Sequence, residues 1–255
     1  MQLTDLRLTL SPTDLIFSDF DATISLEDTG LAMMRQLSPA KQEIAWELEH
    51  RWRDQQIDSM QCLSEQWALI DWSEDELLAF IDSLPIDSAF DDFARYVQRV
   101  GAHLVVVSDG LDLYVHRILQ REGFETCEGR DDGGPLPFPP PSEGGGVPRE
   151  AGRGGRNPLA VFANHAEVTP TGLRITFPFR DDECTQCGNC KRKHLRALRR
   201  HYQRVVYIGD GHSDRCASQD ADILFAKSHL AEICDEEGRD YVPFEGFEDI
   251  LRRVA

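Results

Sequence analysis

The 255-residue chain lacks any long apolar run, and its basic residues are too few to balance its acidic ones. No apolar stretch approaches the roughly 18 residues that a membrane span needs, so we expect no membrane segment. Acidic residues outnumber basic ones 45 to 27, which argues against a nucleic-acid or anionic-lipid surface as the main feature. Asp5 lies where an export signal has its apolar core, and we therefore expect a cytoplasmic protein.

Residues 128–158 are unusually rich in glycine and proline. Nine of these 31 residues are Gly and seven are Pro, so the segment cannot sustain a helix or a central strand. Its few large apolar residues cannot offset the entropy lost on ordering. We predict a mobile surface insertion; a proline-rich docking segment and a gene-model artefact are the alternatives.

The rest of the chain alternates short apolar runs with helical patterns, as in Leu111–Glu122. Short runs rich in β-branched residues fit buried parallel strands, and their alternation with helices predicts a doubly wound α/β sheet. A hairpin is expected over residues 168–177, because Pro-Thr-Gly separates two short runs. The four predicted parallel strands are residues 15–17, 103–107, 205–208 and 223–226.

Residues 27–97 contain no strand-like run and carry several helical stretches, one of which opens with a capping box at Ser73 and Glu76. We therefore predict a small helical cap over 27–97, inserted into an α/β core formed by residues 1–26 and 98–255.

Acidic and hydroxyl residues follow three of the predicted strands. Ligands bind at the carboxyl edge of an open α/β sheet, so these side chains should gather there. Four carboxylates in one small site need a cation, and a hard divalent ion, Mg²⁺ by preference, suits oxygen ligands. The predicted cluster consists of Asp19, Asp21, Asp210 and Asp214.

The pair Asp19 and Asp21 adds a possible chemistry. On an extended backbone, residues i and i+2 point the same way, so one carboxylate can attack phosphorus while the other protonates the leaving oxygen. A lone D-x-D is weak, because such pairs are often caps or turns. Combined with Ser108-Asp109-Gly110 and G-D-x-x-x-D after later strands, the pattern indicates phosphoryl transfer.

These motifs resemble those of the haloacid dehalogenase superfamily of phosphatases, in the phosphoserine-phosphatase-like branch with a helical cap. Within that branch the CTQCGNCK, YIGDGHSD and YVPFEGFEDI strings are most similar to the methionine-salvage phosphatases that act on 2-hydroxy-3-keto-5-methylthiopentenyl-1-phosphate. The resemblance runs from about Asp14 to Ile250, apart from the predicted insertion. It implies a Mg²⁺-dependent phosphomonoesterase with an aspartyl-phosphate intermediate and a small phosphorylated metabolite as substrate.

The resemblance also implies a role for each motif residue. Asp19 would be the nucleophile and a metal ligand, and Asp21 would be the general acid and base, with its backbone carbonyl on the metal. Lys191 would pair with the nucleophile and the phosphate; the alternative reading makes it part of a solvated basic turn that includes Lys193. Asp210 would be a metal ligand, with Asp214 in the coordination shell or holding it. The residues implied to contact or orient the substrate are Thr23, Asp28, Ser108, Asp109 and Gly110.

Two residues depart from the family pattern. Ala22 replaces a glycine common at that place, and Asp109 stands where phosphoserine phosphatases usually carry glycine. The second departure puts the contacts to the leaving group in doubt, so the substrate is open between the methionine-salvage intermediate, phosphoserine, and phosphocholine or phosphoethanolamine.

The odd number of cysteines, seven, argues against a disulfide framework and for free thiols or a metal site. Three of them, Cys184, Cys187 and Cys190, have the spacing C-x2-C-x2-C, with His194 four residues on. Structural zinc needs four such ligands, so the string could hold Zn²⁺, or it could be a tight loop that delivers Lys191. The corresponding alternative to an enzyme is a non-hydrolytic metal-binding module with interaction duties.

Overall fold

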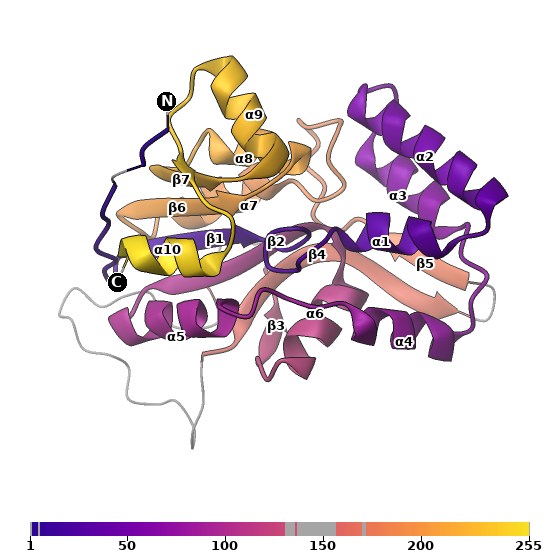
Figure 1. The fold of residues 1–255 in the computed structure, drawn as a ribbon, viewed down its shortest axis with the longest axis horizontal. Coiled ribbons are helices and arrows are strands. Elements are labelled where there is room, and N and C mark those ends of the chain that lie inside the picture. Colours follow the sequence, from indigo (N-terminus) through magenta and orange to yellow (C-terminus); the bar gives the residue numbers. More distant parts are fainter. Residues whose placement is uncertain (1, 5, 131–135, 137–156, 170–171, 255) are drawn as a thin grey trace.

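A sheet with helices on both faces forms the centre of the molecule (Figure 1). The computed structural model describes residues 2–4, 6–130, 136, 157–169 and 172–254. The strands are β1 (Asp14–Asp19), β2 (His103–Leu111), β3 (Thr126–Glu128), β4 (Leu159–Thr169), β5 (Gly172–Thr176), β6 (Arg204–Gly209), β7 (Ile223–Ala226) and β8 (Val242–Pro243). The helices are α1 (Thr29–Gln36), α2 (Pro39–Arg53), α3 (Ser59–Trp67), α4 (Glu74–Ser83), α5 (Phe90–Val100), α6 (Asp112–Arg121), α7 (Lys191–Arg199), α8 (Arg215–Ser218), α9 (Ser228–Glu237) and α10 (Phe247–Val254).

The strand order is β3-β4-β2-β1-β6-β7-β8, and every pair along this path is parallel. Only β5 runs antiparallel, against β4. The fold is therefore the predicted doubly wound α/β sheet. Because β2, β1 and β6 are neighbours, the carboxyl ends of the three strands that carry the acidic motifs lie side by side.

Successive side chains of β1 point to opposite faces of the sheet, and helices cover both faces. Leu15 and Phe17 pack on one face with residues of α7 and α9, whereas Ile16 packs on the other with residues of α5 and α10. All three side chains are fully buried. A continuous apolar run is the pattern of a strand covered on both faces, and here it fixes β1 in the middle of the sheet.

The four predicted parallel strands appear as β1, β2, β6 and β7, each with its expected residues inside the observed bounds. The hairpin differs from the prediction, because its first strand, β4, begins at Leu159 and pairs with β2 and β3 before it meets β5. Most of the predicted insertion 128–158 lies outside the described residues. Of its described part, Glu128 ends β3 and Leu136 is buried in the sheet's core.

Helices α1 to α4 lie between β1 and β2 in the chain and stand beside the carboxyl edge of the sheet (Figure 1). The capping box that opens α4 is present as predicted, with the Ser73 hydroxyl accepting from the Glu76 N–H. Helix α5 instead packs against β2 and α10, and α4 packs against α6. No helix among the described ranges is both long and apolar enough to cross a membrane.

Candidate active site

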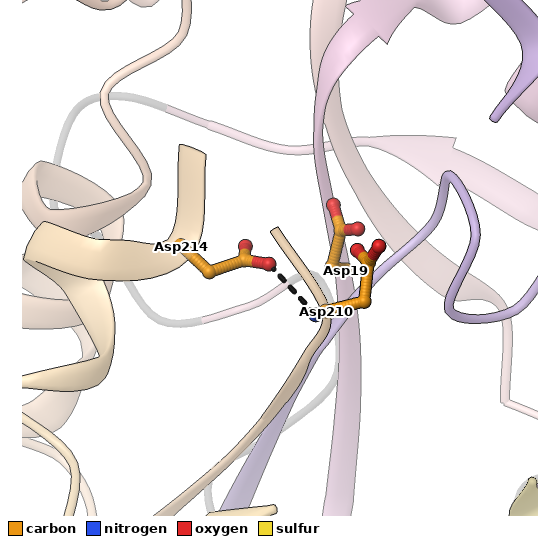
Figure 2. A group of neighbouring side chains, drawn as sticks. All are labelled: Asp19, Asp210 and Asp214. Carbon is orange, nitrogen blue, oxygen red and sulfur yellow. Dashed lines mark hydrogen bonds between the residues drawn. The ribbon is translucent and has the colours of Figure 1, made fainter. Parts of the chain in front are cut away.

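The ends of β1, β2 and β6 bring the acidic motifs to one place. Asp19, the last residue of β1, is paired in register with Val107, one residue before Ser108. On the other side, Ser18 pairs with Ile208, so Asp210 follows at the same edge. One carboxylate oxygen each from Asp19, Asp210 and Asp214 lies within 4.8 Å of the others, and these are the side chains drawn in Figure 2.

Lys191, the first residue of α7, reaches into this cluster. Its Nζ donates to Asp19 Oδ1 at 2.5 Å, to Asp214 Oδ1 at 2.7 Å and to the Ser213 hydroxyl at 2.9 Å. Burial alone would lower the pKa of Lys191, but the two carboxylates raise it above its usual value, so the ammonium stays charged. The side chain is 2% exposed. The structure therefore resolves the choice between a solvated turn and a buried partner of Asp19 in favour of the partner.

Asp214 is enclosed by donors. Its Oδ1 accepts from Lys191 and from the Tyr207 hydroxyl at 2.7 Å, and its Oδ2 accepts from the backbone N–H groups of Asp210 and Gly211 at 3.1 Å each. A carboxylate has about four acceptor positions, and all of them are occupied here. Figure 2 shows the Asp214 side chain turned toward the Asp210 backbone. Asp214 thus fastens the Asp210 loop to Lys191.

Asp19 and Asp210 carry more negative charge than their surroundings neutralise. Burial, and then the neighbouring Asp214, raise the pKa of Asp19 well above its usual value. The same two causes raise the pKa of Asp210 to about 6. The charged forms of Asp19 and Asp210 are disfavoured because they are buried and because the neighbouring carboxylates repel one another. A hard divalent cation bound by their oxygens would remove this repulsion. The chemistry of these oxygen donors therefore fits Mg²⁺.

Asp21 lies beside the cluster and is held by three donors. Its Oδ1 accepts from the Thr29 N–H at 3.0 Å, and its Oδ2 accepts from the Ser108 hydroxyl at 3.0 Å and from the Tyr114 hydroxyl at 2.7 Å. The Gly110 N–H donates to Ser108 Oγ at 2.9 Å. The structure thus joins the β1 and β2 motifs at Asp21.

The other predicted residues also surround this place, and the structure shows their contacts within the protein. Thr23 donates to Asp210 Oδ1 at 3.3 Å. Asp28 caps α1 by accepting from the Leu31 N–H, and burial followed by repulsion from Asp21 raises its pKa to about 7. Asp109 accepts from the Asn189 N–H at 2.7 Å, so its side chain secures the loop before Lys191.

A cavity of about 430 Å³ opens onto these residues. Its floor includes Asp19, Asp21 and Asp210, and its walls come from α1, α2 and α3. A cavity of this size suits a small metabolite. The walls include the apolar side chains of Leu31, Trp52, Leu63 and Trp67.

The predicted zinc site is not supported. In the part of the chain that the structure describes, the three aspartates are the one group of three or more potential ligands close enough to share an ion. The buried His194 ring instead hydrogen-bonds Asn189 Oδ1 at 2.6 Å, and the Cys190 thiol faces Asp181. The fourth potential ligand, His194, is therefore engaged elsewhere, and the string forms the loop that leads into Lys191, the first residue of α7.

Sequence reasoning missed two residues of the site. Asn189 donates from its side chain to the carbonyls of Ser108 and Phe162 at 2.8 and 2.9 Å, which ties the Lys191 loop to β2 and β4. Tyr114 reaches Asp21 from α6. The available signal was position: Asn189 lies two residues before Lys191, and Tyr114 lies in the first turn of the helix that follows the Ser108 motif.

Comparison with known proteins finds phosphatases of similar sequence. No family model matches the chain. It is 28% identical over 246 residues to a 2-hydroxy-3-keto-5-methylthiopentenyl-1-phosphate phosphatase of Bacillus velezensis, covering 94% of this chain and 89% of that protein. It is 26% identical over 239 residues to the protein of the same name from Bacillus cereus, covering 92% and 93%.

Solved structures share the fold. A phosphoserine phosphatase solved as a phospho-aspartyl intermediate analogue matches with a TM-score of 0.62 at 16% identity, over 94% of this chain and 98% of that one. A haloacid dehalogenase family hydrolase from Salmonella enterica serovar Typhi matches with a TM-score of 0.65 at 16% identity, over 98% and 72%. The chain thus has the fold of these haloacid dehalogenase-type hydrolases, and over more than nine-tenths of its length it is similar in sequence to proteins named as phosphatases.

Proposed function

We propose that the protein hydrolyses a small phosphorylated metabolite with Mg²⁺, through a phosphoryl group carried on Asp19, and that its substrate is the methionine-salvage intermediate named for its relatives. The observation that carries the proposal is the contact of the buried Lys191 with Asp19, which lines the cavity. Beside it lies a second carboxylate, Asp21, which accepts from two hydroxyl groups. This arrangement provides a nucleophile, a cation for the transferring group and a proton donor.

The protein groups account for both halves of the reaction. An Asp19 oxygen attacks phosphorus while the protonated Asp21 gives its proton to the leaving oxygen, and Asp21 then takes a proton from the water that hydrolyses the acyl phosphate. Lys191 balances the charge of Asp19 and of the phosphoryl oxygens. With substrate bound, the Ser108 hydroxyl would turn to a phosphoryl oxygen, as its role in the family implies, and the Tyr114 hydroxyl would remain the donor to Asp21 Oδ2.

Asp19, Asp210 and the backbone carbonyl of Asp21 would hold Mg²⁺. The ion would supply positive charge between the nucleophile and the phosphoryl oxygens. For Asp214 we favour a positioning role over direct ligation, because its acceptor positions are filled by Lys191, Tyr207 and two backbone N–H groups. Thr23 would orient Asp210 in the same way.

The cavity wall supports a substrate with an apolar tail. Leu31, Leu63 and the Trp52 and Trp67 rings provide apolar surface beyond the carboxylates. Two arginines also line the cavity, but Arg35 pairs with Glu27 and Arg53 pairs with Glu49 at 2.8 Å. Their charges are already matched, which makes a tail with its own carboxylate, such as that of phosphoserine, the weaker fit.

A second candidate is phosphocholine or phosphoethanolamine. The Trp52 and Trp67 rings share the cavity with Glu49 and Asp28, and aromatic faces together with carboxylates favour a cationic head group.

The test is a panel of phosphorylated metabolites incubated with Mg²⁺ and, separately, with EDTA, with release of phosphate as the readout. The panel contains 2-hydroxy-3-keto-5-methylthiopentenyl-1-phosphate, phosphoserine, phosphocholine and phosphoethanolamine. We expect Mg²⁺-dependent turnover with the highest kcat/KM for the first of these. Highest kcat/KM for phosphocholine would select the second candidate, and no turnover of any ester by a folded, Mg²⁺-supplied enzyme would contradict the proposal.

A further inference from the structure

Tyr114 reaches Asp21, the proposed general acid, from outside the motifs of β1, β2 and β6. Its hydroxyl donates to Asp21 Oδ2 at 2.7 Å, and this bond is shorter than the 3.0 Å bonds from Ser108 and Thr29. The residue belongs to α6, whereas Asp21 follows β1, so the bond links parts of the chain that are 93 residues apart. A hydrogen bond to a charged group is among the stronger kinds in proteins.

Gly110 makes this contact possible. A Cβ at position 110 would lie 1.5 Å from the Tyr114 hydroxyl oxygen and 2.8 Å from Asp21 Oδ2. Neither separation is sterically possible, so a side chain there would push the hydroxyl away from the carboxylate. The glycine of the Ser108 motif and the tyrosine of the next helix therefore form a matched pair.

The Tyr114 ring is held on both sides. It stacks on Trp67 of α3, with ring centroids 5.9 Å apart and an interplanar angle of 16°, and it packs at 6.0 Å against Phe20, which lies directly between Asp19 and Asp21. The side chain is 2% exposed. Its hydroxyl is thus placed jointly by the helices over the cavity and by the loop that carries Asp21.

The three donors divide the two oxygens of Asp21 unequally. Oδ2 accepts from both hydroxyls, while Oδ1 accepts from the Thr29 N–H alone. With about two acceptor positions on each oxygen, one position remains, and it is on Oδ1. A tyrosine hydroxyl keeps its proton at neutral pH, so Tyr114 acts as a donor in this bond.

We infer that Tyr114 is a positioning residue for proton transfer: by occupying Oδ2 it directs the exchangeable proton of Asp21 to Oδ1, the oxygen with the open position. This inference rests on the proposed function. In the first step the proton leaves Oδ1 for the ester oxygen as the P–O bond breaks, and in the second the attacking water returns a proton to Oδ1. Tyr114 keeps its own proton throughout.

The test compares two esters with Tyr114→Phe, which removes one oxygen and retains the ring. Departure of an alkyl alcohol from phosphorus needs protonation, whereas p-nitrophenolate leaves without it. The readout is the ratio of kcat/KM for an alkyl phosphate to kcat/KM for p-nitrophenyl phosphate, because kcat/KM reports the steps up to departure of the leaving group. The ratio also cancels any inactive fraction of the sample.

We expect Tyr114→Phe to lower this ratio roughly 10- to 100-fold, mostly through the alkyl ester. Asp21→Asn is the reference and should lower it further. Tyr202→Phe is the matched control, because it deletes a hydroxyl that bonds His103 at 2.5 Å on the opposite end of the sheet, and it should leave the ratio unchanged.

Two results would overturn the inference: an unchanged ratio in Tyr114→Phe, or equal losses for both esters, which would indicate a merely structural role. Failure of the proposed function has a different signature. In that case the wild-type enzyme hydrolyses neither ester with Mg²⁺, or Asp19→Asn retains activity, and the inference falls with it.

Discussion

Replacement of Lys191 by methionine would remove the ammonium that contacts both Asp19 and Asp214, while keeping a side chain of similar length. All three residues are buried, with 4% exposure for Asp19 and none for Asp214. Loss of one partner leaves the remaining carboxylates close together in a region of low dielectric constant. The variant should therefore lose stability as well as activity.

The magnitude follows from the burial. Breaking a buried ion pair by removing one partner costs about 3–5 kcal/mol, because the other charge stays uncompensated. For a domain of this size such a loss lowers Tm by roughly 10 °C. Thermal and urea unfolding in EDTA measure the loss, since a bound cation would compensate for the missing lysine.

The sign of the pH dependence is also determined. The pKa of Asp19 is already raised in the folded state, so the folded protein binds a proton that the unfolded chain has released, and its stability falls as pH rises through that range. Without Lys191 the pKa rises further. The stability deficit of Lys191→Met should therefore be smaller at about pH 5 than at about pH 8.

Lys193→Met is the matched control, because Lys193 lies on the same helix turn and donates to the Arg180 carbonyl at an exposed position. It should change the free energy of unfolding by less than about 1 kcal/mol. Equal losses in the two variants, or a Lys191→Met deficit that does not change with pH, would refute the reasoning.

Three further substitutions test other parts of the site. In EDTA, Asp28→Asn should gain at least about 1 kcal/mol of stability relative to wild type as pH rises from about 4 to about 7. The raised pKa of Asp28 means that its charged form destabilises the folded wild type in this range, whereas an amide is uncharged and still caps α1. A difference in stability that stays constant across that range would contradict this. Gly110→Ala should lower kcat/KM by roughly 100-fold, since its Cβ would displace the Tyr114 hydroxyl, and wild-type kinetics would refute the close contact. Ala22→Gly should raise the free energy of unfolding by up to about 1 kcal/mol, because Ala22 has a φ of 53°, and a destabilised variant would show that this strain is not stored.

The sequence predicted the sheet and its acidic edge because both signals are local. Each of the strands β1, β2 and β6 contains a short apolar run. The acidic and hydroxyl residues at the end of each run can be identified as potential catalytic or metal-binding groups from the sequence alone. Parallel strands then bring their ends together whatever the loops do. That is why the convergence of Asp19, Ser108 and Asp210 followed from single stretches of sequence.

The contacts that depend on tertiary packing did not follow. The bond from Tyr114 to Asp21 requires α6 to lie over the end of β1, and the room made by Gly110 is visible only in three dimensions. The zinc prediction for the cysteine string fails for a related reason, because the spacing did not show that its fourth potential ligand, His194, hydrogen-bonds Asn189 instead. β4 was missed in part because its long first half follows directly on the glycine- and proline-rich segment.

The division of the chain into a core of residues 1–26 and 98–255 and a cap of 27–97 stays a prediction. The packing of α5 on β2 and α10 suggests that a cap boundary before residue 90 describes the helices better. A helix that covers the sheet and a helix that covers the cavity show the same apolar periodicity in the sequence. The pattern therefore could not indicate whether α5 belongs to the core or to the cap.

The central claim is that the phosphoryl group passes through Asp19. Quenching the enzyme during turnover and reducing it with borohydride converts an aspartyl-phosphate into homoserine, which peptide mass spectrometry locates. The account predicts homoserine at position 19 in the wild-type protein and in Asp21→Asn, and none in Asp19→Asn. Turnover with no modified residue 19, or with homoserine at another aspartate, would contradict it.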